Sequence, residues 1–263
     1  MTWVRTLPAC PEFPNAHLRS LRHSGQSATS CDTISHPTME PEETTTLRVS
    51  YDRVAKHYVE QIFNELEHKP LDRALLDRLA DDVRGSGPIC DLGCGPGQVA
   101  RYLSSKGADV FGIDLSPVMV EQARDLNPGV EFRQGNMMSL EDEPESWGGV
   151  AAFYSIIHIP RDEMVDALRG LVRVLRPGGL LLLAFHLGQE TIHRDEWWGE
   201  EVSIDFLMFE ADELDGYLKA AGFEVEETIE RDPYPDVEYP SRRAYIFARK
   251  PGSSSAASKQ MPT

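Results

Sequence analysis

The chain has 263 residues, of which 41% are hydrophobic, and it carries a formal net charge of −17. This length and apolar content suffice for one large α/β domain or two small ones with a substantial core. The negative charge argues against nucleic acid or an anionic membrane as a partner, because both are bound through clustered Lys and Arg.

The cysteines and the apolar runs restrict the class of protein further. Cys10, Cys31, Cys90 and Cys94 form neither a CxxC pair nor a paired zinc spacing. We therefore expect no disulfide framework, no metal ion and a reducing compartment, the cytoplasm. No apolar run approaches the roughly 20 residues of a membrane-spanning helix, so we expect a soluble protein, either a monomer or a homodimer.

The two ends differ in composition from the middle of the chain. Residues 1–45 mix Pro, Ser, Thr and His without helical or strand periodicity, which predicts a disordered N-terminal extension. Residues 251–263 have the composition of a flexible tail. The sequence between them, 46–250, shows neither an internal repeat nor a second core, so we predict one domain.

Helix and strand signals alternate through most of this domain, which is typical of a parallel sheet covered by helices. The expected elements in chain order are a helix over 71–85, a strand over 88–92, a helix over 99–107, a strand over 109–114, a helix from Ser116 to 127–129, and strands over 130–134 and 148–157. A helix over 161–179 and a strand over 180–185 complete this part. Ser116 followed by Pro117 is a favourable helix start.

The C-terminal part changes character. The segment 186–210 interrupts the sheet pattern, and a helix over 211–223 follows. Two alternating segments, 223–229 and 242–250, then predict a hairpin-like pair joined by a proline-rich loop. The fold class that we predict is α/β: a Rossmann-like three-layer sandwich whose mostly parallel, seven-stranded sheet has an antiparallel C-terminal strand.

The glycine-rich stretch "DLGCGPGQVA" at 91–100 follows the first predicted strand and indicates a nucleotide-binding loop. Gly95, Gly97 and Ala100 satisfy GxGxxA, and Asp114 lies near the offset of a ribose-binding acid, so an NAD-dependent oxidoreductase is one interpretation. However, Asp91 directly precedes the glycines, where a carboxylate would repel a pyrophosphate. It suits a ligand with an ammonium group and no phosphate.

A series of motifs in this order resembles the class I S-adenosylmethionine-dependent methyltransferases, specifically the small-molecule group. The matching pieces are "YDRVAKHY", "CDLGCGPG", "GIDLSPVMVEQAR", "GNMMSL", "FYSIIHIP" and "LRPGGLLLLAF". The resemblance extends from about Tyr51 to Lys250. It implies S-adenosylmethionine as cofactor and methyl transfer to an oxygen or nitrogen of a small organic acceptor. A protein that binds the cofactor without methyl transfer is a further alternative.

The resemblance also assigns cofactor-binding residues. They are Tyr51, Tyr58, Asp91, Gly93, Cys94, Gly95, Gly97, Asp114, Leu115, Asn136, Met137 and Ser155. Asp91 would help hold the methionyl amino end, Asp114 would accept both ribose hydroxyls, and Tyr51 and Tyr58 would close over the methionyl part. Asn136 stands where the family commonly has Asp, and its carbonyl would accept from the adenine amino group. We interpret Cys94 as a small side chain that packs within the loop.

Candidate catalytic side chains follow the strands, because open α/β sheets bind ligands at the carboxyl ends of their strands. They are His158 and His186, either of which could serve as a general base, and Asp205. Asp205 lies in the segment 186–210, whose aromatic residues would either wall an acceptor pocket or form ordinary core.

Overall fold

A computed structural model describes residues 41–252 of the chain. The disorder that we expect for the outermost residues, 1–40 and 253–263, lies outside the described range. Helix α1 (Pro41–Ile62) begins ahead of the predicted domain boundary at 46, so that boundary is placed too late. The missed helix carries the tyrosines of the "YDRVAKHY" motif.

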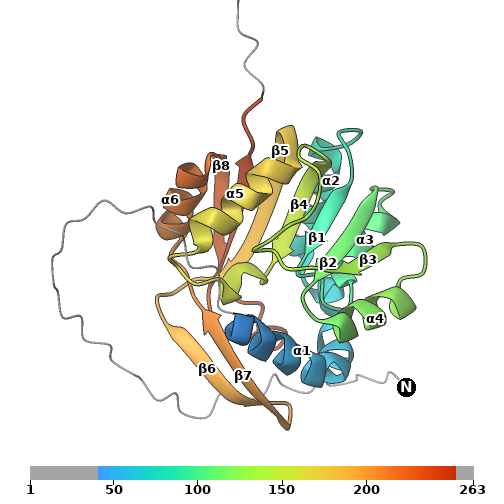
Figure 1. The fold of residues 1–263 in the computed structure, drawn as a ribbon, viewed down its shortest axis with the longest axis vertical. Helices are drawn as coiled ribbons and strands as arrows, with labels where there is room; N and C mark the ends of the chain where they lie inside the picture. The colour runs from blue at the N-terminus through green and yellow to red at the C-terminus, as the bar shows by residue number, and fades with distance from the viewer. Residues whose placement is uncertain (1–40, 253–263) are drawn as a thin grey trace, which may run out of the picture.

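Seven strands form one sheet in the order β3-β2-β1-β4-β5-β9-β8, visible edge to edge in Figure 1. Their bounds are β1 Ile89–Leu92, β2 Val110–Asp114, β3 Glu131–Gln134, β4 Trp147–Phe153, β5 Leu175–His186, β8 Glu224–Arg231 and β9 Arg243–Arg249. Strands β1 to β5 pair in parallel. Strand β9 lies antiparallel to both β5 and β8, which confirms the predicted fold class.

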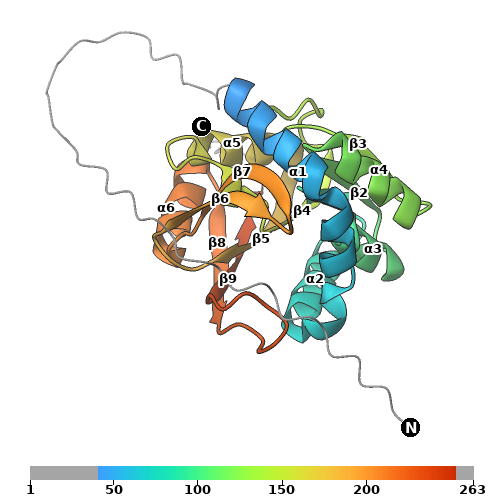
Figure 2. The ribbon, with the colours of Figure 1, turned by 90° about the horizontal axis from the view of Figure 1, so that it is seen from below.

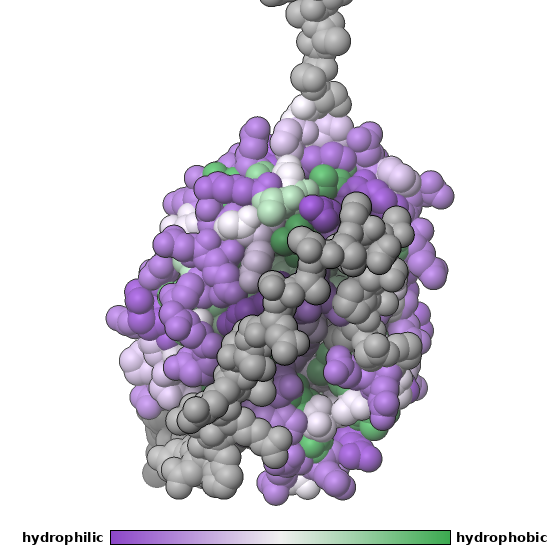
Figure 3. Space-filling view, turned by 60° about the vertical axis from the view of Figure 1, so that its left-hand side comes forward, coloured by the Kyte–Doolittle hydropathy of each residue, from purple (hydrophilic) through white to green (hydrophobic). Residues whose placement is uncertain are grey.

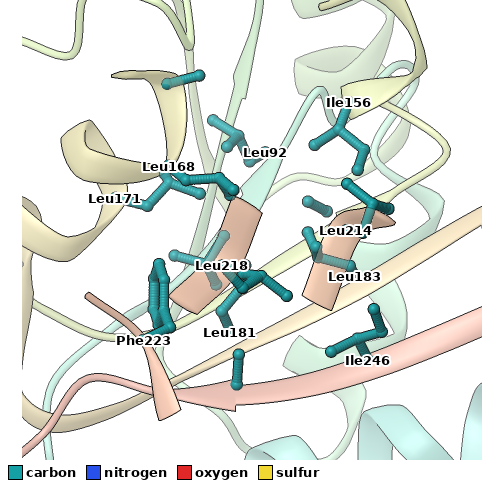
Figure 4. Packing of buried hydrophobic residues seen from close by; sticks show 14 of the residues in the cluster. Leu92, Ile156, Leu168, Leu171, Leu181, Leu183, Leu214, Leu218, Phe223 and Ile246 are labelled. Atoms are coloured by element: carbon teal, nitrogen blue, oxygen red, sulfur yellow. The ribbon is translucent and has the colours of Figure 1, made fainter. Parts of the chain in front are cut away.

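Helices cover both faces of this sheet. Helices α2 (Pro70–Asp82), α3 (Gln98–Ser105) and α4 (Pro117–Leu126) share one buried apolar cluster with it. Helices α5 (Met164–Val174) and α6 (Ala211–Ala221) share the other cluster. Figure 4 shows leucines of α5 and α6 directed at leucines of the central strands. Both faces of the sheet are therefore buried, as a parallel sheet requires.

Helix α1 and a two-stranded antiparallel hairpin lie outside this sandwich. The hairpin consists of β6 (Thr191–Trp197) and β7 (Glu200–Leu207). Figures 1 and 2 show α1 running alongside β7, beyond one end of the sheet. A third, small apolar cluster centred on Val54, Val202 and Ile204 joins helix and hairpin. Two 3-10 turns, η1 (Glu65–His68) and η2 (Ile156–His158), complete the described elements.

Several element boundaries differ from the prediction, most clearly around α5 and β4. Helix α5 ends at Val174, and β5 starts at Leu175, where a helix was expected through 179. Pro177 explains the early end, because the residue before a proline is disfavoured in helical geometry. Strand β4 ends at Phe153, and the turn η2 replaces the predicted end of that strand. Sequence reasoning missed the β6–β7 hairpin, which it left as an interruption of the sheet.

The surface in Figure 3 is largely hydrophilic, with small scattered apolar areas among the residues that are not grey. Among residues 41–252, no helix combines the length and the apolar composition that a membrane span requires.

Candidate functional site

A pocket of about 790 Å³ opens at the carboxyl ends of β1, β2 and β4, beneath α1. Parallel α/β sheets bind their ligands at this edge. Its lining includes ten of the predicted site residues: Tyr51, Tyr58, Gly93, Gly95, Asp114, Leu115, Asn136, Met137, Ser155 and His158. Asp114 is the only Asp, Glu, Lys or Arg in the described lining. The pocket therefore offers no cationic side chain to a phosphate.

Asp114, the last residue of β2, has both carboxylate oxygens directed at backbone amides. Oδ2 accepts from Gly95 N–H at 2.8 Å, and Oδ1 accepts from Ser116 N–H at 2.8 Å. Burial raises the pKa of Asp114 to about 6, although these amides favour the charged form. Each oxygen keeps a second lone pair, so this carboxylate can still accept hydrogen bonds from a pair of ligand hydroxyls.

The first glycine of the loop, Gly93, allows two chain segments to approach each other closely. Its φ is +71°, and a Cβ built on it would lie 2.3 Å from Cβ of Ser155. No larger residue fits between the β1 loop and the end of β4. The Ser155 Oγ is buried and has no hydrogen-bond partner among the described residues. Because buried polar atoms are normally satisfied, this hydroxyl is available to a ligand.

Helix α1 forms the roof of the pocket through two tyrosines. Tyr51 and Tyr58 meet edge to face with ring centroids 6.3 Å apart, and both contact the ring of Trp197 on the hairpin. The helix is tied to the sheet by Ser116 Oγ, which donates to Asp52 Oδ1 at 2.6 Å. It is tied to the hairpin by Ser203 N–H, which donates to Ser50 Oγ at 3.0 Å. The roof thus consists of α1 and the hairpin together.

His158 closes the pocket wall at η2. Its Nε2 lies 2.7 Å from the hydroxyl of Tyr51, and its Nδ1 lies 2.9 Å from the backbone carbonyl oxygen of Asp205. Burial lowers the pKa of His158 to about 4, so the imidazole is neutral at pH 7. A neutral imidazole in a ligand pocket can accept a proton.

Comparison with known proteins identifies the family. Residues 89–179 match the family described as "Methyltransferase domain". A ubiquinone biosynthesis O-methyltransferase of Xylella fastidiosa is 30% identical over 212 residues, which cover 68% of this chain and 84% of that protein. The chain belongs to the S-adenosylmethionine-dependent methyltransferases.

Two further comparisons are consistent with this methyltransferase family. A malonyl-[acyl-carrier protein] O-methyltransferase of Enterobacter lignolyticus is 31% identical over 147 residues, 54% of this chain and 54% of that protein. The chain thus spans about half the length of that relative. The crystal structure of a methyltransferase from Methanosarcina mazei superposes with a TM-score of 0.59 at 21% identity, covering 65% of this chain and 96% of the other. At that identity, the likeness shows the fold.

The pocket of this methyltransferase suits its family's cofactor better than a dinucleotide. Asp114 can receive ribose hydroxyls, and the loop amides of Gly95 and Ala100, which a pyrophosphate would need, already donate to the carboxylates of Asp114 and Asp91. The unpartnered Ser155 hydroxyl gives a further polar contact inside the pocket. When bound, S-adenosylmethionine supplies an electrophilic methyl group on a positively charged sulfur.

Three predicted cofactor residues of the methyltransferase motif lie behind the loop rather than in the lining. Asp91 is buried, and its Oδ2 accepts from Ala100 N–H at 2.9 Å, at the start of α3. A Cβ on Gly97 would lie 2.7 Å from both Asn127 and Phe132, so this glycine permits packing. Cys94 is buried in the same apolar cluster as Phe132, in agreement with its interpretation as a small side chain that packs within the loop. In the structure all three support the shape of the loop, and their predicted contacts with the cofactor stay predictions.

The side chains of two of the predicted catalytic residues, His186 and Asp205, lie outside the described lining of the pocket. His186 is absent from the described lining; its Nδ1 pairs with Ser241 Oγ at 2.7 Å, and its ring packs behind Tyr154. Burial, with the charge of Arg243, lowers the pKa of His186 to about 3. The carboxylate of Asp205 is exposed on the outer side of the hairpin, 2.7 Å from His193. Only the backbone carbonyl of Asp205 reaches the site, because alternate side chains of a strand point to opposite faces.

Asn136 lies in the pocket with its amide orientation fixed. Its Oδ1 accepts from Met138 N–H at 2.9 Å. Because a backbone N–H can only donate, the oxygen must face it and the NH₂ group faces the other way. The hydrogen bond that we expect from the adenine amino group to Oδ1 of Asn136 remains a prediction. It would have to use the second lone pair of this oxygen.

Sequence reasoning missed Tyr154, which the structure places in the lining. Tyr154 has φ +54°, an unusual value for a residue with a large side chain, and its hydroxyl has no hydrogen-bond partner among the described residues. Backbone strain of this kind concentrates at functional sites. The position of Tyr154, directly after the buried strand β4, is the sequence signal that could have identified this residue.

Proposed function

We propose that this protein transfers a methyl group from S-adenosylmethionine to an oxygen or nitrogen of a small organic acceptor. The observation that carries this proposal is the pocket beneath α1, whose lining includes both the carboxylate of Asp114, which can accept hydrogen bonds from ligand hydroxyls, and the neutral imidazole of His158. Methyl transfer from a sulfonium is a displacement that depends on holding the nucleophile in line with the methyl group and excluding water.

The roles that we propose for the chain follow from these positions. Asp114 and the Gly93–Gly95 loop hold the cofactor, with Leu115 and Met137 beside the adenine. Ser155 contacts the methionyl part, and the two tyrosines of α1 cover it. The acceptor enters on the side of Tyr154 and His158. The curated relatives named above act on malonyl-[acyl-carrier protein] and in ubiquinone biosynthesis, which supports oxygen as the attacked atom.

The proposed setting is the cytoplasm, with the protein as a monomer or homodimer and with neither nucleic acid nor a membrane surface as a partner. The net charge of −17 supports the exclusion of polyanions. Light scattering in solution tests the oligomeric state.

Calorimetry with S-adenosylhomocysteine, followed by mass spectrometry of an acceptor panel incubated with S-adenosylmethionine, tests the function. We expect binding, and a mass gain of one methyl group on at least one acceptor. Absence of binding contradicts the family's cofactor for this chain. Binding without transfer to any acceptor supports the alternative of a non-methylating protein.

A further inference from the structure

The hydrogen bonds of His158 define which of its nitrogens carries the proton. Nδ1 lies 2.9 Å from the carbonyl oxygen of Asp205, which can only accept. Nδ1 must therefore carry the hydrogen. In the neutral ring Nε2 is then a bare acceptor, so the hydroxyl of Tyr51, 2.7 Å away, donates to it.

This protonation state determines which group can accept a hydrogen bond from an acceptor molecule. The Nε2 lone pair of His158 is occupied by Tyr51, so the histidine has no free lone pair to offer directly. The Tyr51 oxygen donates its one hydrogen to Nε2 and keeps its own lone pairs. Tyr51 lines the pocket, and these lone pairs are available to a hydroxyl that enters there.

The charges around the pocket favour an acceptor that arrives uncharged. A carboxylate acceptor needs no base but does need a positive partner when it is buried. Apart from the sulfonium of the bound cofactor, a carboxylate would find no positive partner there: the described lining contains neither Lys nor Arg, and Asp114, its one charged side chain, would repel an anion. A neutral hydroxyl, by contrast, needs a route by which its proton leaves.

We propose that Tyr51, backed by His158, takes the proton from an un-ionised hydroxyl of the acceptor during methyl transfer. The proposal rests on the methyltransferase function proposed above. As the acceptor oxygen bonds to the methyl carbon, the carbon–sulfur bond breaks and its electron pair stays on sulfur, which leaves as S-adenosylhomocysteine. The acceptor proton moves to the Tyr51 oxygen, and the original Tyr51 proton moves to Nε2 of His158.

The two proton movements must accompany the formation of the carbon–oxygen bond. Burial, together with nearby Tyr58 and Asp114, raises the pKa of Tyr51, which disfavours a tyrosinate. Burial also lowers the pKa of His158, although the Asp205 backbone and charge oppose this shift. Neither ion is stable in advance of the reaction, so His158 acts as a positioning residue that receives a proton only through Tyr51.

The proton arrangement can be measured without turnover. In protein labelled with ¹⁵N at histidine and saturated with S-adenosylhomocysteine, we expect the Nδ1 of His158 to be protonated and Nε2 to be bare. The variant His158→Gln assigns the signals. Tyr51→Phe should move the Nε2 resonance and leave the tautomer unchanged. An Nε2-protonated ring, or an Nε2 resonance that does not respond to Tyr51→Phe, overturns the proposal.

The acceptor class is tested with a panel of phenols, alcohols, primary amines and carboxylic acids. We expect ethers as the products, and Tyr51→Phe should lower kcat for an un-ionised phenol by about 10²- to 10⁴-fold, the usual contribution of a proton-transfer group. A nitrophenol that is already ionised at the assay pH should lose less than about tenfold, because no proton has to leave.

The matched control is Tyr58→Phe, since this neighbouring roof tyrosine has no histidine partner among the described residues. Its effect should appear in the affinity for S-adenosylhomocysteine and be equal for the two phenols. Transfer only to amines or carboxylates, or equal losses for both phenols in Tyr51→Phe, overturns the proposal while leaving the methyltransferase function intact. Failure of that function would appear as no methyl transfer to any member of the panel.

Discussion

The backbone amide of Gly95 donates to Oδ2 of Asp114 at 2.8 Å, so the glycine loop after β1 is tied to the end of β2 at the wall of the pocket. The carboxylate that is placed to receive the ligand also fixes the loop that surrounds the ligand. Changes at Asp114 should therefore alter both affinity and local structure.

Affinity for S-adenosylhomocysteine should rise as the pH increases through about 6, the value to which burial raises the pKa of Asp114. Ligand hydroxyls donate to the ionised carboxylate, so binding lowers that pKa and releases a proton, and the association constant rises by up to about tenfold per pH unit. Calorimetry between pH 5 and 8 in two buffers of different ionisation enthalpy measures both effects.

Asp114→Asn should weaken binding at pH 8 by about 10- to 100-fold, the contribution of hydrogen bonds to a charged group, and should flatten the pH dependence. Asp109→Asn is the matched control, because Asp109 is exposed near the opposite end of β2. Equal pH profiles for wild type and Asp114→Asn would assign the titration to another group, such as Asp91.

Gly93→Ala should destabilise the protein more than Gly107→Ala. Both glycines have positive φ, +71° and +80°, so both substitutions carry the strain of a left-handed residue, about 1–2 kcal/mol. Only at Gly93 would the new Cβ also collide with Ser155, adding about 1–3 kcal/mol of overpacking. Urea unfolding measures the two free energies, and equal values would contradict the close approach.

Stability should fall as the pH rises from about 4 to about 7 because of Asp91. Burial raises the pKa of Asp91 to about 7, opposed by its hydrogen bond from Ala100. Above pH 4 the unfolded chain has lost this proton while the native state keeps it. The contribution of Asp91 is thus present below the unfolded pKa and disappears through pH 7, a change on the order of a few kcal/mol.

Asp91→Asn, which keeps an oxygen for Ala100 N–H, should remove most of this slope and be more stable than wild type at pH 8. Asp114 contributes a smaller slope of the same sign in both proteins. Denaturation curves at pH 5, 6, 7 and 8 give the free energy of unfolding of both proteins. The same pH dependence in wild type and Asp91→Asn would rule out a protonated Asp91.

Asp72→Ala should be strongly destabilising. Asp72 is fully buried and accepts from Tyr245 Oη at 2.7 Å and from Arg231 at 3.0 Å. Its removal leaves the Tyr245 hydroxyl without this acceptor inside the protein, while Arg231 keeps its ion pair with Glu238, so the expected cost is about 1–3 kcal/mol. Thermal and urea unfolding provide the measurement.

Asp77→Ala is the comparison, because Asp77 pairs with Lys106 at 3.0 Å and accepts from Tyr102 Oη at 2.9 Å with its side chain 41% exposed. An exposed pair contributes less than about 1 kcal/mol. A loss at Asp77 as large as that at Asp72 would contradict the role of burial.

The parts of the structure that the sequence predicted depend on local signals. The loop at 91–100, Asp114 at a strand end and the N-cap Ser116, whose side chain accepts from Met119 N–H, all depend on neighbouring residues. The buried strands alternate with amphipathic helices along the chain, and this alternation predicts a parallel sheet covered by helices. These features could therefore be placed without knowledge of distant contacts.

The unpredicted parts depend on tertiary contacts. Val54 and Ala55 of helix α1 are buried by elements that lie far away in the sequence. The helix itself has only a weak amphipathic pattern, so its sequence does not indicate this burial. The outward direction of the Asp205 side chain could have been inferred from the alternation of side chains along a strand. Val202 and Ile204 are buried, whereas Ser203 and Asp205, which alternate with them, are exposed. The position of His186 could not have been inferred, because the loop that holds Ser241 returns from a distant part of the chain.

The separate apolar cluster of Val54, Val202 and Ile204 has a consequence for the geometry of the proposed proton acceptor. Helix α1 and the hairpin pack on each other through this cluster, outside the two clusters that bury the sheet. Both partners of His158, the Tyr51 hydroxyl and the Asp205 carbonyl, belong to these two elements. The orientation of the imidazole therefore depends on how α1 and the hairpin pack together, in a part of the fold that the sheet does not contain.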